Sequence, residues 1–110
     1  MKQYIFVYGL FRDSGRGLLN DATFCGRATV NGKIYRVSEF YPGFVNAKGK
    51  VFGDVYLIDP SILPKLDEFE GDEYFRTKIH TSIDIECWIY QYKNPIDNFK
   101  EIKGGDWILR

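Results

Sequence analysis

One segment of this 110-residue chain has the pattern of a helix, and the segments around it are short and typical of strands. Asp59 is a suitable N-cap, Pro60 falls at the first helical position, and Gly71 is a typical helix stop. A chain of this length is too short for two ordinary domains. We therefore predict a single domain over residues 1–110, a closed or nearly closed β-barrel with the helix lying across it.

The predicted strands are rich in β-branched and aromatic residues and are bounded by turn residues. They cover residues 4–8, 23–30, 33–37, 50–58, 74–81 and 85–93. Asn31-Gly32 predicts a two-residue hairpin between the second and third strands, because a type I′ turn needs positive φ at both central residues. Gly53 lies inside a strand, which indicates a bulge or a close approach of another part of the chain.

The charge and the content of histidine and cysteine exclude several classes of function. Fifteen Lys and Arg residues balance fifteen Asp and Glu residues, so no net charge attracts nucleic acid or an anionic membrane. His80 is the only histidine, and Cys25 and Cys87 form no metal-binding motif, so we expect no metal site. We expect both cysteines to be free, buried thiols, with one disulfide bridge between them as the alternative. No segment is apolar over the length needed to cross a bilayer, and the N-terminus lacks the features of a signal peptide. We therefore expect a cytoplasmic protein.

Glu70 conflicts with an otherwise apolar face of the predicted helix. At about 100° per residue, one stripe of the helical wheel contains Ile62, Leu63, Leu66 and Phe69. Glu70 falls inside this stripe, whereas Glu68 falls on the opposite, solvent-facing side. A buried carboxylate without a basic partner has a raised pKa, and a general acid or base near neutral pH needs such a pKa. Alternatively, the Glu70 side chain turns out to water past Gly71 or pairs with Arg76 or Lys78.

The first predicted strand ends at Gly9. A buried strand that ends in glycine directs successive backbone N–H groups into a cavity, where such groups commonly bind a carboxylate or an oxyanion. An ordinary turn is the alternative interpretation of the same glycine.

Short motifs occur in order along almost the whole chain. They are YGLFR at residues 8–12, YPG at 41–43, GDVY at 53–56, LDEFEG at 66–71, YFR at 74–76, WIY at 88–90 and GDW at 105–107. Together they resemble the γ-glutamylcyclotransferase-like family, in its small branch with γ-glutamylamine cyclotransferase and AIG2-like proteins. The resemblance implies an α+β fold, a small mixed β-barrel of about six strands with short flanking helices and one cavity at its mouth.

Members of this family cleave a small γ-glutamyl amide by attack of its own α-amino group on its γ-carbonyl, without a metal or an organic cofactor. The products are 5-oxoproline and a free amine or amino acid. The resemblance implies that Glu70 is the general acid/base and that Tyr74 lines the substrate pocket. It also implies that backbone N–H groups bind the glutamyl α-carboxylate or the developing oxyanion. These N–H groups belong to Tyr8, Gly9, Leu10 and Phe11. We add Tyr41 as a substrate-facing lid, with a packed loop aromatic as the alternative.

The residues agree with this chemistry because intramolecular attack needs no nucleophile from the protein. One glutamate of raised pKa can accept a proton from the amine and later donate it to the leaving group. The chain departs from the family pattern at Leu10, where the family has Ser or Thr, and at Phe11, where it has Leu. This departure motivates the alternative of a non-catalytic small-molecule-binding barrel of the same fold. A barrel that stacks single-stranded nucleic acid is a third hypothesis, for which the balanced charge provides no basic groove.

Overall fold

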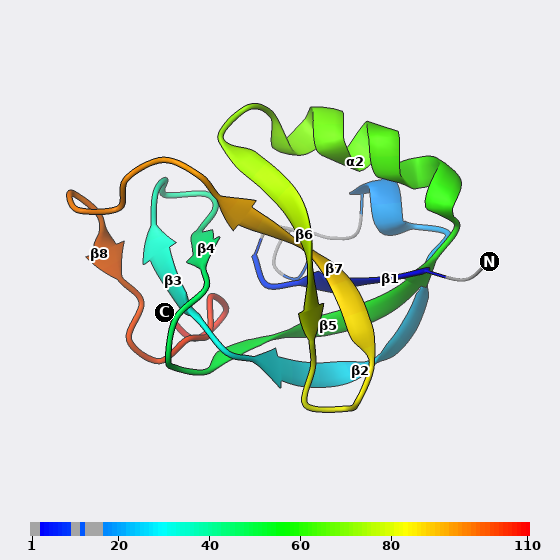
Figure 1. The fold of residues 1–110 in the computed structure, drawn as a ribbon, viewed down its shortest axis with the longest axis horizontal. Helices are drawn as coiled ribbons and strands as arrows, with labels where there is room; N and C mark the ends of the chain where they lie inside the picture. The colour runs from blue at the N-terminus through cyan, green and yellow to red at the C-terminus, as the bar shows by residue number, and fades with distance from the viewer. Residues whose placement is uncertain (1–2, 10–11, 13–16) are drawn as a thin grey trace.

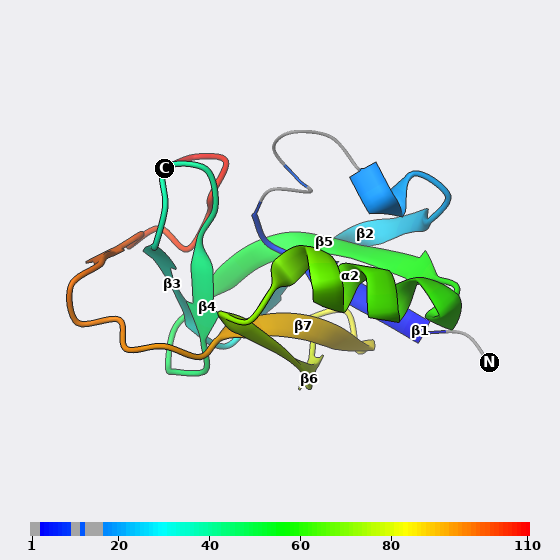
Figure 2. The same cartoon turned by 90° about the horizontal axis from the view of Figure 1, so that it is seen from above.

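Eight strands form one mixed sheet in the structure, a computed structural model that describes residues 3–9, 12 and 17–110 (Figures 1 and 2). The strands are β1 (Gln3–Val7), β2 (Thr23–Val30), β3 (Lys33–Arg36), β4 (Gly43–Val45), β5 (Val51–Ile58), β6 (Tyr74–His80), β7 (Glu86–Tyr92) and β8 (Lys100–Glu101). The helical segments are the 3-10 turns η1 (Gly17–Leu19) and η2 (Pro60–Ile62) and the α-helix α2 (Leu63–Glu70). No helix in these residues is long and apolar enough to cross a membrane.

Strand β7 is the centre of the sheet. The strand order is β2-β5-β1-β7-β4-β3-β8, in which β7 pairs in parallel with both β1 and β4. Strand β6 pairs antiparallel with β7 outside this path. Within the described part of the chain no ladder joins β2 to β8, so the sheet is barrel-like but open. The predicted small mixed α+β barrel is confirmed as a fold class, with eight strands instead of about six and without full closure.

The segment from Asp59 to Gly71 forms the predicted helix and covers one face of the sheet (Figure 2). The Asp59 carboxylate accepts a hydrogen bond of 2.9 Å from a backbone N–H two residues later, which caps η2. Pro60 opens η2, which continues directly into α2, and Gly71 ends α2 with a φ of 79°. These ends are as predicted, because capping depends on residues within one turn.

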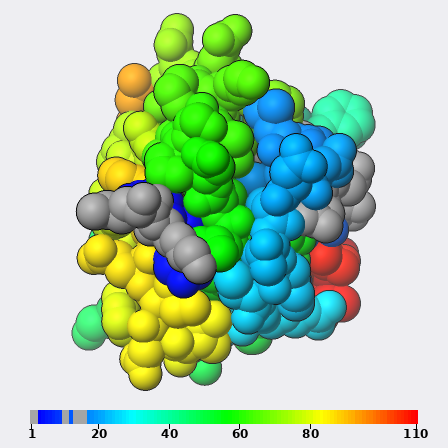
Figure 3. Space-filling model, turned by 90° about the vertical axis from the view of Figure 1, so that its right-hand side faces the viewer, coloured from blue at the N-terminus to red at the C-terminus, as the bar shows by residue number. Residues whose placement is uncertain are grey.

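The last turn of α2 differs from the predicted apolar stripe. Leu63 and Leu66 are buried and Ile62 is partly buried, whereas Phe69 is 53% exposed. Phe69 is exposed because the helix here no longer covers the packed core and borders a cavity instead. Glu68 is exposed, as predicted. On the face shown in Figure 3, the helical segment (green) lies beside η1 and β2 (blue and cyan).

The predicted hairpin at Asn31-Gly32 is wrong. Strand β2 pairs with β5, and β3 pairs with β4 and β8, so the strands on either side of this dipeptide do not pair with each other. Gly32 lacks the positive φ of a type I′ turn, and a Cβ atom there would lie 2.7 Å from the carbonyl oxygen of Val45. Because Gly32 has no side chain, the backbone at this position can pack closely against β4, and it does not form a tight turn. Gly53 has the predicted close approach, since its Cβ would lie 2.4 Å from the carbonyl oxygen of Val7.

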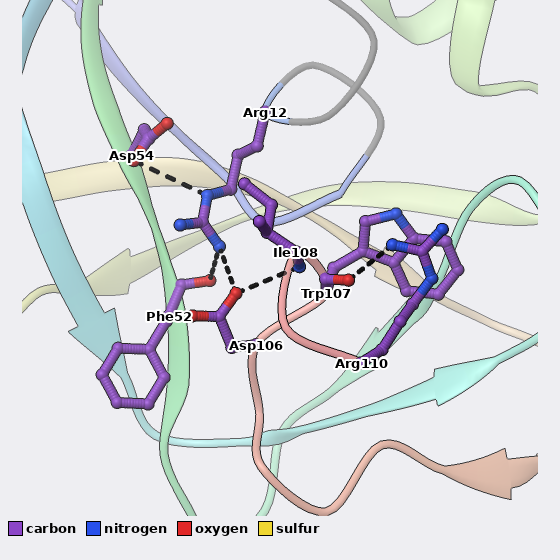
Figure 4. A network of polar contacts seen from close by, with 7 residues as sticks. All are labelled: Arg12, Phe52, Asp54, Asp106, Trp107, Ile108 and Arg110. Atoms are coloured by element: carbon purple, nitrogen blue, oxygen red, sulfur yellow. Dashed lines mark hydrogen bonds and ion pairs between the residues drawn. The ribbon is translucent and has the colours of Figure 1, made fainter.

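A buried ion network ties the chain after β1 to β5 and to the C-terminal segment (Figure 4). Arg12 Nη1 donates to a backbone oxygen of β5 at 3.2 Å and to the Asp106 carboxylate at 3.0 Å, and Arg12 Nε lies 3.6 Å from Asp54. The Arg12 side chain is only 4% exposed, so its charge depends on these two carboxylates. The neighbouring Trp107 is fully buried, with the guanidinium of Arg110 3.8 Å from its ring centroid. The C-terminal segment is thereby fixed against the end of the sheet.

Candidate active site

The end of β1, the end of α2 and the segment before β4 enclose a cavity of about 260 Å³. Its walls are mainly apolar and aromatic, formed by Ile5, Phe6, Val7, Tyr8, Gly9, Tyr41, Pro42, Phe69, Glu70, Tyr74 and Tyr90. Among these lining residues, Glu70 is the only one with a carboxyl group in its side chain, and none has a cationic side chain.

The cavity brings together most of the site residues that the sequence predicted. Those that line it are Tyr8, Gly9, Tyr41, Glu70 and Tyr74. The other two predicted residues, Leu10 and Phe11, lie outside the described residues. Segments far apart in the sequence therefore meet at one hollow, as the motifs predicted.

The cavity lies where two strands leave the same edge of β7. Strand β6 occupies one edge of β7, so β1 and β4 share the other. Tyr8 bridges the space between them, because its hydroxyl donates to the backbone oxygen of Tyr90 at 2.6 Å and accepts from the N–H of Phe44 at 3.2 Å. Gly9 packs so closely against Pro42 that a Cβ atom would lie 2.5 Å from Pro42 Cδ. These contacts fix the width of the opening in the sheet.

Glu70 is the last residue of α2, and its side chain lines the cavity. The Glu70 carboxyl group has no hydrogen bond or ion pair with any residue that the structure describes. Burial alone raises the pKa of Glu70 from 4.5 to about 7. The partners considered as alternatives are engaged elsewhere, Arg76 with Asp67 at 3.1 Å and Lys78 with Glu86 at 3.7 Å. Glu70 is therefore an acid that is half protonated near neutral pH.

Tyrosine side chains form much of the wall around Glu70. Tyr74 is buried, and its hydroxyl donates to the backbone oxygen of Pro42 at 2.7 Å. Burial, followed by the charge of Glu70, raises the pKa of Tyr74, which keeps its hydroxyl protonated. Tyr41 is 36% exposed and packs edge-to-face on Tyr74, with ring centroids 6.4 Å apart. Tyr41 thus combines a packed aromatic contact with exposure at the cavity mouth.

Sequence reasoning missed six lining residues, namely Ile5, Phe6, Val7, Pro42, Phe69 and Tyr90. Alternation along the strand around residues 85–93 places Tyr90 on the same face as Trp88, which does not line the cavity, so this pattern alone could not have identified Tyr90. The hydroxyl of Tyr90 donates to Asp67 Oδ1 at 2.6 Å, a contact between strand β7 and helix α2.

The described residues contain no group of three or more His, Cys, Asp or Glu side chains that could hold a metal ion. Cys25 and Cys87 are both free, and Cys87 is buried as predicted. Cys25 is exposed, contrary to the prediction, because it lies on the outermost strand β2 beside a bulge. The cavity therefore offers one carboxyl group of raised pKa and aromatic walls, which suit proton transfer to a bound organic molecule.

Residues 5–109 match the family described as "Gamma-glutamyl cyclotransferase, AIG2-like". The "Gamma-glutamylcyclotransferase family protein YtfP" of Escherichia coli (strain K12) is 37% identical over 111 residues, with 96% of each chain covered. The "Gamma-glutamylaminecyclotransferase" of Bos taurus is 32% identical over 108 residues, which cover 78% of this chain and 63% of that protein. The solution structure of ytfP from Escherichia coli superposes with a TM-score of 0.78 at 36% identity, with 96% of both chains covered. The crystal structure of an aig2-like protein from Mus musculus superposes with a TM-score of 0.71 at 25% identity, covering 86% of this chain and 80% of that one.

Proposed function

Because the chain belongs to the AIG2-like γ-glutamyl cyclotransferase family, we propose that it converts a γ-glutamyl amine or γ-glutamyl amino acid into 5-oxoproline and the free amine or amino acid. Glu70 is the general acid/base in this proposal. The observation that carries it is the position of Glu70, a carboxyl group without a partner among the described residues, in an apolar cavity that raises its pKa to about 7.

The proposed reaction is an intramolecular acyl transfer. The α-amino nitrogen of the substrate attacks its γ-carbonyl carbon, so a ring C–N bond forms and the original amide C–N bond breaks. Glu70 accepts the proton that the amine loses and donates a proton to the departing nitrogen. The reaction consumes no water, because the nucleophile is the amine of the substrate itself. A group with a pKa near the working pH can do both, and such proton transfer contributes a factor of about 10² to 10⁴ in rate.

The other residues of the cavity have supporting roles in this proposal. The N–H of Gly9 binds the glutamyl α-carboxylate or the developing oxyanion, together with the adjoining Leu10 and Phe11. The hydroxyls of Tyr8 and Tyr74 are bonded to backbone oxygens, so these residues contribute walls of fixed position. These walls hold the glutamyl chain folded, with its amine against its carbonyl, which raises the effective concentration of the nucleophile. Tyr41, at the mouth, faces the amine that leaves.

The test is release of 5-oxoproline from a panel of γ-glutamyl amines, γ-glutamyl dipeptides and glutathione. Glu70→Gln should lower kcat/KM by about 10² to 10⁴, whereas Glu68→Gln, on the exposed side of the same helix, should leave it unchanged. The wild-type kcat/KM should fall below about pH 7, because Glu70 must be ionised to accept a proton. Turnover by Glu70→Gln within a few-fold of wild type would exclude the acid/base role. Ligands that raise the Tm of the wild-type protein without being consumed would instead identify a non-catalytic binding barrel.

A further inference from the structure

Three of the tyrosines that line the cavity with Glu70 have a hydroxyl that donates its proton to another group. Tyr8 and Tyr74 donate to backbone oxygens at 2.6 and 2.7 Å, and Tyr90 donates to Asp67 Oδ1 at 2.6 Å. A phenol has a single proton to donate. None of these three protons is therefore available to the carboxylate of Glu70, although the phenol oxygens can still accept a bond from its protonated form.

Among the three acceptors, the one that belongs to a side chain is Asp67. Asp67 precedes Glu70 by one helical turn, which on a helix corresponds to about 5–6 Å between Cβ atoms. Tyr90, whose hydroxyl is hydrogen-bonded to Asp67, lines the same cavity as Glu70. The pKa of Tyr90 is raised by burial, by Asp67 and also by the charge of Glu70.

Asp67 is itself held in place. Arg76 Nε lies 3.1 Å from Asp67 Oδ1, and Arg76 Nη2 donates to Oδ2 at 3.2 Å, so the two groups form a two-point contact. The guanidinium of Arg76 also lies over the ring of Trp88, 4.5 Å from its centroid. The aspartate is thus held in place and oriented toward Tyr90.

We infer that Asp67 is a positioning residue for the acid/base, which holds the Tyr90 hydroxyl proton away from Glu70. A hydrogen bond donated to a carboxylate favours the ionised form, so this diversion keeps Glu70 able to retain a proton near neutral pH. The inference rests on the proposed role of Glu70. Among the residues that the structure describes, the titratable groups that line the cavity with Glu70 are Tyr8 just after β1, Tyr74 on β6, Tyr90 on β7 and Tyr41 at the mouth, and Asp67 lies three residues before Glu70 on α2.

The experiment is a direct titration of Glu70 by ¹³C NMR of its side-chain carboxyl, in variants that still fold by circular dichroism. In Asp67→Ala the Tyr90 hydroxyl is released, and the pKa of Glu70 should fall by at least about one pH unit, a tenfold change in its acid constant. In Tyr90→Phe it should stay within about half a unit of wild type, because the lost hydroxyl did not donate to Glu70. Glu68→Ala is the matched control and should change nothing.

Two further variants separate redirection of the proton from simple removal of a negative charge. Asp67→Asn removes the charge but keeps an oxygen that accepts from Tyr90, so the pKa of Glu70 should stay near its wild-type value. The double variant Asp67→Ala/Tyr90→Phe has no hydroxyl to redirect, so the pKa should return toward that value. Equal falls in Asp67→Ala, Asp67→Asn and the double variant would show a charge effect alone and overturn the inference.

The Tyr90→Phe variant decides the question even if Asp67→Ala does not fold. A rise of about one unit or more in the pKa of Glu70 would mean that Tyr90 donates to Glu70 in the wild type, contrary to the inference. The titration needs no turnover, so its outcome is independent of the 5-oxoproline assay. In an active enzyme, the low-pH limb of kcat/KM should move with the titrated pKa in every variant.

Discussion

Glu70→Gln should make the protein more stable at alkaline pH and leave its stability nearly unchanged in acid. Burial raises the pKa of Glu70 to about 7 in the folded protein, from 4.5 for the free group. Between these two values the folded state keeps the proton and the unfolded chain releases it, so the free energy of unfolding falls as the pH rises. Glutamine has no proton to lose, so the variant does not share this fall.

The size of the effect follows from the two pKa values. Each pKa unit is equivalent to about 1.4 kcal/mol, so the shift from 4.5 to about 7 corresponds to about 3 kcal/mol. The free energy of unfolding of Glu70→Gln should therefore match that of wild type near pH 4.5 and exceed it by up to about 3 kcal/mol at pH 8.

Urea unfolding at half-unit steps from pH 4.5 to 8 measures this difference directly. Glu68→Gln is the control, since it removes an exposed carboxylate of the same helix. The difference between Glu70→Gln and wild type should grow with pH, and the difference for Glu68→Gln should not. A constant difference for Glu70→Gln would refute the argument, because it would mean that Glu70 ionises in the folded protein as easily as in the unfolded chain.

Arg12→Met should lower the free energy of unfolding by about 3–5 kcal/mol, because it leaves the carboxylates of Asp54 and Asp106 mostly buried without their cation. Adding Asp106→Asn to it should recover part of this loss in urea unfolding, and strictly additive losses would argue against one coupled network. Gly53→Ala should cost about 1–3 kcal/mol, since its methyl group would lie 2.4 Å from a carbonyl oxygen of β1. Gly104→Ala, where a Cβ meets nothing within 4 Å, is its control, and equal Tm values for the two variants would contradict the packing argument.

The helix and its acidic end could be predicted from sequence because their signals are local. Asp59 and Gly71 act within one turn of their own positions, and the place of Glu70 on the wheel follows from the helical period. The strand pairing around Asn31-Gly32 could not be predicted in this way. The dipeptide is a strong short-range hairpin signal, but the packing of Gly32 against β4 overrides it, and that contact depends on the whole sheet.

Several residues of the candidate site could be predicted from the sequence, but the hydrogen bonds that hold them in place could not. Motifs identified Tyr8, Tyr74 and Glu70, which all line the cavity. The bonds that fix the two tyrosine hydroxyls cross 82 and 32 sequence positions, and no local pattern records them. The contact of Tyr90 with Asp67 was missed for the same reason, since it joins a strand to a helix.

The pairing of the first strand with the seventh affects how the protein is made. Strand β1 leaves the ribosome before its parallel neighbour β7, which ends only at Tyr92. Contacts between distant parts of a chain slow folding, because a long loop must close before they form. In a nascent chain that does not yet include β7, one edge of β1 has no strand to pair with, and the cavity has not formed. The chain must therefore be synthesised beyond Tyr92 before the cavity can form.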